Sequence, residues 1–464
     1  MAASQIEELN RLSDNLLDDI LSRPRDSDWL IDTNDFMVQQ SIEVDPSAIL
    51  GEGGYGAVFL FTLEGSQYAL KRTVYKSTNE YIAPWEARSL YEVDGVLRIP
   101  LDNEWYHEMI KDLSDQYGDT ELTIRNAFPL DWDGKRIAKA EDYDSDGELI
   151  ESDEIAKHTI VQISQRVRKI YYSHESRVLH CYHDDLQEWI VNTYLKRVSK
   201  SPHLTKYAGM YHTINDMRFH THFALMDLND YNIHRYFIQL ETQPEDVRDA
   251  IGNSLFVQGL IALHHMWEVG VYHGDIHQGN IMIKLLPNCV KNGATHLKYD
   301  NGVHVPLHPL GGIVKIIDFG LTTIKTEDGM HVIYINPSND TSDNDLSDYH
   351  ISREIRKLLD NVVYRFREVF SMISAFDQHS SLAKEVFNYL YNKSGSGIGF
   401  NEYPINVVGV MDSRYFNMVR YDLKDVSPTM LFSECSALKK YMKSIEDTPD
   451  KRFIDIGECE MLER

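Results

Sequence analysis

Two carboxylates and an amide stand at spacings that suit the chemistry of phosphate and metal ions. Asp275 and Asn280 are separated by four residues in the segment HGDIHQGN, which lies between a helix-like run and an apolar run. Asp318 follows a second apolar run, GIVKII, and opens the triplet Asp-Phe-Gly. A carboxylate orients a hydroxyl and accepts its proton, while carboxylate and amide oxygens are ligands for Mg²⁺. Phosphoryl transfer requires these parts.

A glycine-rich segment, GEGGYGAV over residues 51–58, lies between two strand-like runs. Glycines let the backbone pass close to a polyphosphate, although a bulged hairpin also explains them. A dinucleotide-binding fold would place a helix directly after the glycines, whereas AVFLFTL is strand-like. Lys71 follows in YALK, where alternation puts it on the same face as Ala69. Its amine is placed to neutralise phosphate charge; the alternative is an exposed strand lysine.

In this order, the glycine segment, the lysine, the Asp-x₄-Asn segment and the Asp-Phe-Gly triplet resemble the signature set of protein kinases. The resemblance covers roughly residues 47–365. It implies an α+β, two-lobed fold with a small antiparallel β lobe that holds one key helix and a larger, mainly helical lobe. It also implies ATP and Mg²⁺ as cofactors and a protein as the substrate.

Carried over position by position, the resemblance assigns a role to each matching residue. It makes Asp275 the catalytic base, Lys71 the ligand of the α- and β-phosphates, and Asn280 and Asp318 the Mg²⁺ ligands. The nucleotide-binding residues would be Gly51, Gly53, Gly54, Tyr55, Gly56, Val58, Ala69, Lys71, Glu188, Met226, Asp227 and Leu228. Met226 would be the gatekeeper, with Asp227 and Leu228 in the hinge.

The glutamate that pairs with Lys71 is left open between two residues. Glu188 is preferred because the apolar spacing that follows it is helical, and because SPHL at 201–204 resembles the turn after the equivalent kinase helix. Glu86 is nearer to Lys71 in the sequence and remains the alternative.

Several positions depart from the kinase pattern. Gly274 stands where most regulated protein kinases carry arginine, so activation by loop phosphorylation is not expected. His277 stands where serine/threonine kinases usually carry lysine, and HGD with a following histidine also resembles aminoglycoside and choline kinases. No Ala-Pro-Glu triplet occurs. Asp348 is the candidate for the aspartate that braces the catalytic loop, with a helix N-cap as the equal alternative.

The function that follows is ATP-dependent transfer of the γ-phosphoryl group to serine or threonine hydroxyls of proteins. A small-molecule kinase of the aminoglycoside or choline type is the alternative, and a pseudokinase scaffold is a third. Long insertions, after the lysine strand and between Asn280 and Asp318, are similar to those of divergent serine/threonine kinases from large DNA viruses.

The hydrophobic pattern predicts the elements that must position these residues. Helical spacing is found over 5–22, 186–198 and 247–267, and alternating strand-like runs form an antiparallel meander over 47–75. The predicted domains are an N-terminal helical extension at 1–46, an N-lobe at 47–228 with an insertion at about 76–180, and a C-lobe at 229–429 with an insertion at about 287–312. The tail at 430–464 is predicted to be a surface extension.

Composition limits the partners. The chain has 464 residues and a formal net charge of −26, which disfavours nucleic acid because phosphate contacts need clustered cations. No apolar run reaches the ~18 residues of a membrane span. Four widely spaced cysteines and the lack of a signal peptide indicate the cytoplasm, or a host cytoplasm if the protein is viral. The oligomeric state is not predicted.

Two weaker patterns remain. The acidic segment at 142–153 matches a calcium-binding loop at several positions but ends in Asp153 instead of glutamate, so a solvated loop, a Ca²⁺ site and phosphorylation of Ser145 or Ser152 stay open. The histidines at 203, 212, 220 and 222 lack the spacing of a zinc site and are predicted to be packing or surface groups.

Overall fold

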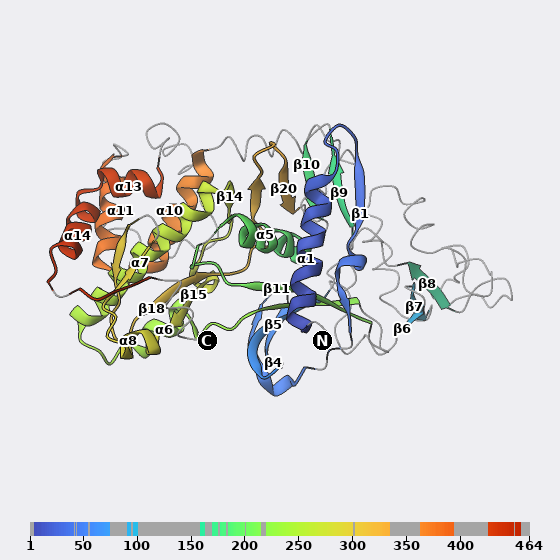
Figure 1. Cartoon of the computed structure of the whole chain (residues 1–464), viewed down its shortest axis with the longest axis horizontal. Coiled ribbons are helices and arrows are strands. Elements are labelled where there is room, and N and C mark those ends of the chain that lie inside the picture. Colours follow the sequence, from blue (N-terminus) through green and yellow to red (C-terminus); the bar gives the residue numbers. More distant parts are fainter. Residues whose placement is uncertain are drawn as a thin grey trace, which may run out of the picture. The chain divides into compact units, whose positions relative to one another are not determined.

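The computed structural model combines helices with several antiparallel sheets, and its contacts divide the chain into two compact units (Figure 1). Unit 1 comprises Met1–Thr193, Tyr207–Asp227 and Val332–Ile351, and unit 2 comprises Tyr194–Lys206, Leu228–His331 and Ser352–Arg464. The structure describes residues 4–40, 42, 44–53, 56–74, 91–93, 96–100, 158–162, 169–174, 177–181, 184–199, 201–214, 220–299, 302–334, 362–393, 426–449 and 451–455. The predicted combination of helices and antiparallel strands is confirmed, whereas the predicted domain boundaries stay predictions.

The main sheet of unit 1 has six strands and contains the predicted meander. In spatial order the strands are Val38–Gln39 (β2), Tyr207–Ile214 (β11), His220–Asp227 (β12), Ser66–Val74 (β5), Gly56–Leu63 (β4) and Ile49–Gly53 (β3). Neighbouring strands are antiparallel except β2 and β11, which are parallel. The register puts Lys71 opposite Val58 on one side and Ala224 on the other.

Further strands of unit 1 come from the N-terminal segment and from the stretch predicted as an insertion. One sheet contains, in order, Trp29–Asp32 (β1), Lys169–Ser173 (β9), Val178–Cys181 (β10) and His331–Tyr334 (β20). A three-stranded sheet contains Tyr91–Val93 (β6), Val96–Pro100 (β7) and His158–Gln162 (β8). The short 3₁₀ helices are Thr33–Phe36 (η1) and Pro46–Ala48 (η2). The end of the predicted insertion is thus paired with the N-terminal strand β1.

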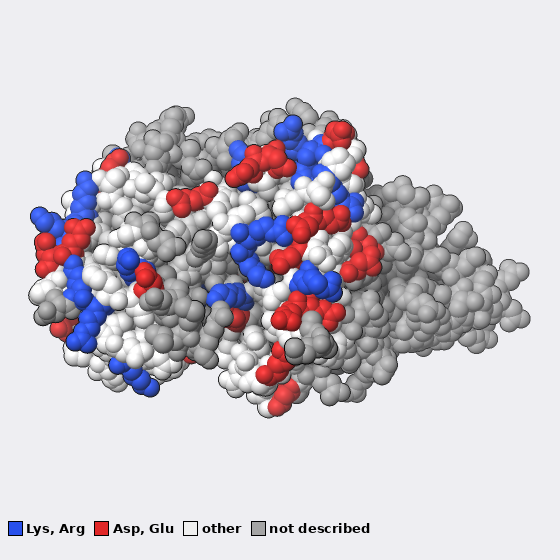
Figure 2. All heavy atoms as spheres, in the orientation of Figure 1, with Lys and Arg blue, Asp and Glu red and all other residues white. Residues whose placement is uncertain are grey.

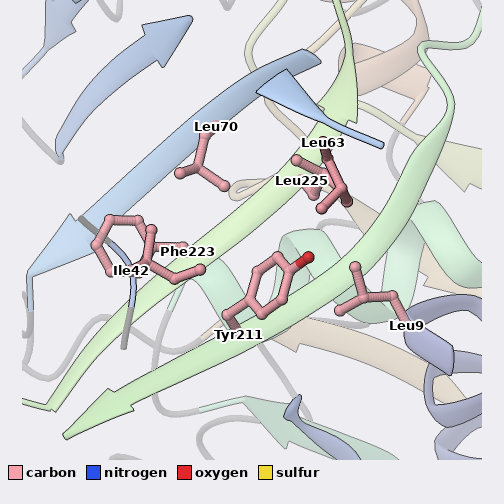
Figure 3. Close-up of a cluster of buried hydrophobic side chains, with 7 residues drawn as sticks. All are labelled: Leu9, Ile42, Leu63, Leu70, Tyr211, Phe223 and Leu225. Atoms are coloured by element: carbon pink, nitrogen blue, oxygen red, sulfur yellow. The ribbon is translucent and has the colours of Figure 1, made fainter. Parts of the chain in front are cut away.

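Helix α1 (Gln5–Ser22) confirms the first predicted helix and packs along β11 (Figure 1). A capping box starts it, because Ser4 Oγ accepts the Glu7 backbone N–H while the Glu7 carboxylate accepts the Ser4 N–H. Its Leu9 joins a buried cluster with residues of four strands of the main sheet, which Figure 3 shows. The cluster comprises Leu9, Ile42, Leu63, Leu70, Tyr211, Phe223 and Leu225.

Gly209 is where α1 and β11 approach each other most closely. Its φ is +155°, and a Cβ there would lie 2.8 Å from both Leu9 O and Ser13 Oγ. The register of β11 against β12 shifts at the same place, between Tyr207 and Gly209. A residue without a side chain is therefore required for α1 to reach the sheet.

Unit 2 is built around helix α7 (Glu245–Glu268), most of whose second half is buried. It confirms the long predicted helix and ends two residues before Gly270. The other helical elements of unit 2 are Ile233–Gln239 (α6), Gln278–Asn280 (η6, 3₁₀), Pro287–Lys291 (α8), Val362–Phe376 (α10), Ser381–Lys393 (α11), Pro428–Glu434 (α13) and Ser436–Glu446 (α14). Helix α5 (Asp184–Val198) belongs to unit 1 as far as Thr193.

Short strands complete unit 2. They are Tyr231–Asn232 (β13), Val271–Tyr272 (β14), Ile281–Leu285 (β15), His296–Lys298 (β16), His304–Pro306 (β17), Gly312–Ile316 (β18), Thr323–Lys325 (β19) and Phe453–Asp455 (β21). The antiparallel pair of β15 and β18 matches the two predicted apolar strands. Strand β21 pairs with β16, which lies in the predicted insertion at 287–312.

The prediction that the tail from 430 is a surface extension is wrong for its described part. Leu431, Cys435 and Leu438 are completely buried, and β21 adds a strand to unit 2. Helix α14 is amphipathic and presents its apolar side, with Leu438 and Ile445, to the unit.

On the face seen in Figure 2, the described basic side chains are interspersed with acidic ones. Among the described helices, none is both long and apolar enough to cross a bilayer.

Cys181 and Cys435 are free thiols, whereas Cys289 is in a disulfide.

Replacing Gly209 by alanine should lower the free energy of unfolding by about 3 kcal/mol, because backbone strain and a clash with α1 add together. Gly65 is the matched control: its φ is +83°, but nothing lies within 4 Å of the position of a Cβ. Gly65→Ala should therefore cost only about 1 kcal/mol. Urea unfolding measures both, and equal losses would contradict the close approach of α1.

Candidate active site

Lys71 on β5 and Glu188 on α5 form an ion pair inside unit 1. Lys71 Nζ lies 2.6 Å from Glu188 Oε2, and the two side chains are 16% and 4% exposed. A charge-assisted hydrogen bond of this length between buried groups fixes the ammonium in one position. Of the two glutamates left open by the sequence, the structure pairs Lys71 with Glu188; Glu86 lies outside the described residues.

The strands bring several predicted nucleotide-binding residues together around Lys71. Val58 is directly opposite Lys71, and Ala69, two residues before Lys71, is opposite Met226. Both Ala69 and Met226 are buried.

The glycine segment forms the end of the β3–β4 hairpin, where Gly51 pairs with Val58 and Gly53 with Gly56. Gly54 and Tyr55 lie outside the described residues. Asp227 ends β12, and Leu228 begins unit 2.

His273 organises the loop of unit 2 that carries Asp275. Its Nδ1 accepts the backbone N–H of Asp275 at 3.2 Å, so the ring proton is on Nε2, which donates to Ile317 O at 2.9 Å. The ring is completely buried, and burial lowers its pKa. It also packs against Phe319, with ring centroids 5.0 Å apart. A neutral histidine thus joins the Asp275 loop to the backbone directly before Asp318.

Gly274 and Glu368 explain why this loop departs from the kinase pattern. Gly274 has a φ of +80°, and a Cβ there would lie 2.4 Å from Leu321 O, so an arginine does not fit in this conformation. The buried Glu368 of α10 accepts the Gly274 N–H at 2.8 Å and the Trp267 indole N–H at 2.5 Å. The sequence offered Asp348 for this bracing role, but Asp348 lies outside the described residues; no motif pointed to Glu368.

Asn280 is tied to Asp275 within the same loop. Its Nδ2 donates to Asp275 O at 3.0 Å and lies 3.4 Å from Asp275 Oδ2. Ile317 N donates to Asn280 O at 3.1 Å, so Asp318 follows directly on the strand end that is bound to Asn280. Asp318 itself has a φ of +65°. The three predicted chemical groups of unit 2 therefore lie at one end of the antiparallel pair formed by β15 and β18.

His277 adds a cation next to the predicted base. Its Nε2 lies 3.5 Å from Asp275 Oδ2, and its Nδ1 accepts the Gly279 N–H at 2.9 Å. The hydrogen bond with Asp275 raises the pKa of His277, with further electrostatic contributions from Asp275 and Asp318. The sequence marked His277 as a departure from lysine and as a point of resemblance to aminoglycoside and choline kinases, but it did not predict the pairing with Asp275.

Asn280 and Asp318 fit a magnesium ion by their chemistry. Since the amide nitrogen of Asn280 donates to Asp275, its Oδ1 is the atom left to face a ligand, and the Asp318 carboxylate supplies a second hard oxygen. Among the described residues no group of three or more His, Cys, Asp or Glu side chains is placed to hold a metal. A magnesium ion here would take its other ligands from phosphate and water. The 142–153 segment, the proposed Ca²⁺ loop, lies outside the described residues.

No family model matches the chain, and no curated protein matches it. Among solved structures, the chain is similar to the crystal structure of the BubR1 kinase domain, with 11% sequence identity, a TM-score of 0.36 and coverage of 100% of both chains. Similarity at this TM-score is too weak to assign a fold, so fold and function depend on the contacts described above.

Replacing Glu368 by alanine should lower the free energy of unfolding of the protein by about 3 kcal/mol, because two donors lose their acceptor inside the unit. Trp267→Phe is the control that removes only one of these hydrogen bonds and keeps the aromatic ring; it should cost about 1 kcal/mol. Denaturant unfolding gives both values. A Glu368→Ala loss no larger than that of Trp267→Phe would mean that the Gly274 hydrogen bond is absent.

The His277 ring should titrate above its ordinary pKa of 6.5, and Asp275→Asn should move it back toward that value. A raised pKa means that the His277–Asp275 attraction is complete below about pH 6.5 and is lost as the pH rises through the raised pKa. NMR titration of the ring protons measures the midpoint in both proteins. An unchanged midpoint in the variant would show that Asp275 is not the cause.

Proposed function

We propose that the chain is an ATP-dependent phosphotransferase of the protein-kinase type, which transfers the γ-phosphoryl group to serine or threonine hydroxyls of proteins. The observation that carries this proposal is the Lys71–Glu188 pair, 2.6 Å long and formed across 117 positions of the sequence. A lysine held by a buried carboxylate on the strand beside a glycine hairpin is what a polyphosphate-binding site needs, since it holds positive charge in a fixed place.

Unit 1 supplies the groups proposed to bind the nucleotide. The hairpin glycines Gly51, Gly53 and Gly56 would approach the phosphates, and Lys71 would neutralise the α- and β-phosphates. Ala69 and Met226, buried and paired across two strands, would line the adenine pocket. The remaining members of the proposed nucleotide set are Gly54, Tyr55, Val58, Glu188, Asp227 and Leu228.

Unit 2 supplies the groups proposed for chemistry. Asp275 would orient the acceptor hydroxyl and accept its proton, while Asn280 and Asp318 would hold magnesium. The ion would neutralise charge on the phosphates. In the transfer, a bond forms between the acceptor oxygen and the γ-phosphorus, and the bond from this phosphorus to the β–γ bridging oxygen breaks. ADP leaves with that electron pair, and the hydroxyl proton passes to Asp275.

The nature of the acceptor hydroxyl divides two candidate functions. The Asp-Phe-Gly triplet and the complete glycine segment support a protein acceptor. The His277–Asp275 pair, 3.5 Å long, favours the alternative, a small-molecule kinase of the aminoglycoside or choline type, whose motif also places a histidine after HGD. A scaffold without catalysis is the least supported, because each phosphate and metal position carries the residue type that the chemistry needs.

Incubation of the full chain with Mg²⁺ and γ-labelled ATP, with casein as a generic protein acceptor, tests the proposal. Label should enter casein, and Asp275→Asn should lower turnover by a factor of about 10² to 10⁴ while nucleotide affinity stays nearly unchanged. Asp249→Asn is the matched control: Asp249 caps Ser381 in unit 2, away from the loop, and its variant should retain full turnover.

Each other result points to a different function. Label found only in an added aminoglycoside or choline would favour the small-molecule kinase. Binding of nucleotide without any transfer would favour the scaffold. Full turnover by Asp275→Asn would remove Asp275 from the role of base, whatever the acceptor.

A further inference from the structure

Helix α5, which carries Glu188, is held at a second position by a buried hydrogen bond. Asp185, one turn before Glu188, is hydrogen-bonded through its carboxylate to His222 Nδ1, and the two side chains are 3% and 1% exposed. His222 lies on β12 opposite Thr73, and Ala224 lies opposite Lys71, so His222 and Lys71 share one face of the sheet. The Asp185–His222 bond therefore fastens the start of α5 to the same sheet face as Lys71.

A third buried contact joins α5 to the N-terminal helix. Trp189, the residue after Glu188, is completely buried and donates its indole N–H to Ser13 Oγ of α1 at 2.9 Å. Ser13 is itself 3% exposed, and its hydroxyl proton goes to Leu9 O at 2.9 Å. The Ser13 oxygen is thus oriented as an acceptor before Trp189 reaches it.

Ser13, the acceptor on α1, is held in place because α1 is packed against the sheet. Leu9, one turn before Ser13, is part of the buried cluster with Leu70 and Leu225, on the face of the sheet opposite to Lys71 (Figure 3). Gly209 lets the α1 backbone lie directly against β11. A displacement of α1 would open this core, so Ser13 offers Trp189 a fixed acceptor.

We propose that Ser13 and His222 are positioning residues that hold Glu188 against Lys71. Helix α1 thereby contributes to the nucleotide site by fixing the position of α5. Glu188 lies between the two anchored positions of α5, three residues after Asp185 and directly before Trp189. Any rotation of α5 that withdraws Glu188 must break both the Asp185–His222 and the Trp189–Ser13 bonds. The use of the ion pair in nucleotide binding rests on the function proposed above.

Removal of either anchor should loosen the ion pair and weaken nucleotide binding. Trp189→Phe and His222→Leu should each raise the Kd for a nonhydrolysable Mg·ATP analogue by about three- to tenfold, the usual effect of one lost buried hydrogen bond. His222→Asn, whose amide replaces the Nδ1 donor, should recover most of the affinity. Thr193→Val is the matched control, since it removes a buried hydrogen bond to Trp189 O in the same helix but no anchor.

The decisive test is the same measurement in a Glu188→Gln background. If the anchors act through Glu188, Trp189→Phe should add almost no further loss there, because the group it positions is already gone. Independent, multiplicative losses in the double variant, or equal effects of Trp189→Phe and Thr193→Val, would overturn the proposal.

A second readout needs no nucleotide and separates this proposal from the proposed function. An ammonium in an ion pair reacts more slowly with amine reagents than a solvated amine, so labelling of Lys71, followed by mass spectrometry, reports the pair directly. Trp189→Phe and Glu188→Gln should both increase labelling of Lys71, and Thr193→Val should not. If Mg·ATP fails to bind the unmodified chain while this labelling pattern holds, the function is wrong and the positioning role stands. Unchanged labelling in Trp189→Phe would refute the positioning role alone.

Discussion

The buried ion pair between Lys71 and Glu188 is the constraint on which the rest of unit 1 depends. A lysine ammonium is costly to remove from water unless an opposite charge and further hydrogen bonds replace its hydration. Glu188 provides that charge only while α5 lies on the face of the sheet that carries Lys71. The surrounding structure is arranged to keep it there: α1 packs along β11, Asp185 of α5 is hydrogen-bonded to His222 of β12, and Trp189 of α5 is hydrogen-bonded to Ser13 of α1.

The loop of unit 2 that carries Asp275 is held in place by neutral and acidic side chains. Its backbone N–H groups lie where no helix or sheet can pair them, so side chains provide the acceptors: His273 for Asp275 and Glu368 for Gly274. The loop is thereby fixed without an arginine, and the glycine that replaces it allows the close passage of Leu321 O. Because hydrogen bonds from within unit 2 already order this loop, phosphorylation is not needed to order it.

His277 gives the loop a feature that depends on pH. The imidazole stands beside the carboxylate proposed as the base, and its hydrogen bond with Asp275 favours the charged form of the imidazole by raising its pKa. A lysine at this position would stay charged over the whole physiological range, whereas a histidine loses its charge within it. The electrostatic environment of Asp275 therefore changes with pH in a way that the usual kinase loop does not.

The sequence by itself determined the local elements and the residue types of the candidate site. Alternation and helical spacing located the β3–β5 meander, α1, α5 and α7. The pattern reflects burial of one face in α1, whereas α5 and α7 are buried on most sides. Asp275 and Asn280 could be read as one site because a short loop joins them, whereas Asp318 reaches them only because β15 and β18 pair across the intervening segment. The segment from 430 was misjudged, because the pattern of a short amphipathic helix such as α14 does not tell which surface will cover it.

Contacts between distant segments were decided only by the tertiary structure. The helical spacing after Glu188 favoured it over Glu86 as the partner of Lys71, but the ion pair itself depends on the packing of α5 in unit 1. Glu368, His222 and Ser13 carry no motif, because a hydrogen bond to a backbone amide, a carboxylate or an indole demands a position in space and not a sequence pattern. The residue types of the candidate site could thus be predicted from the sequence, whereas the side chains that position them could be identified only from the packing of distant segments.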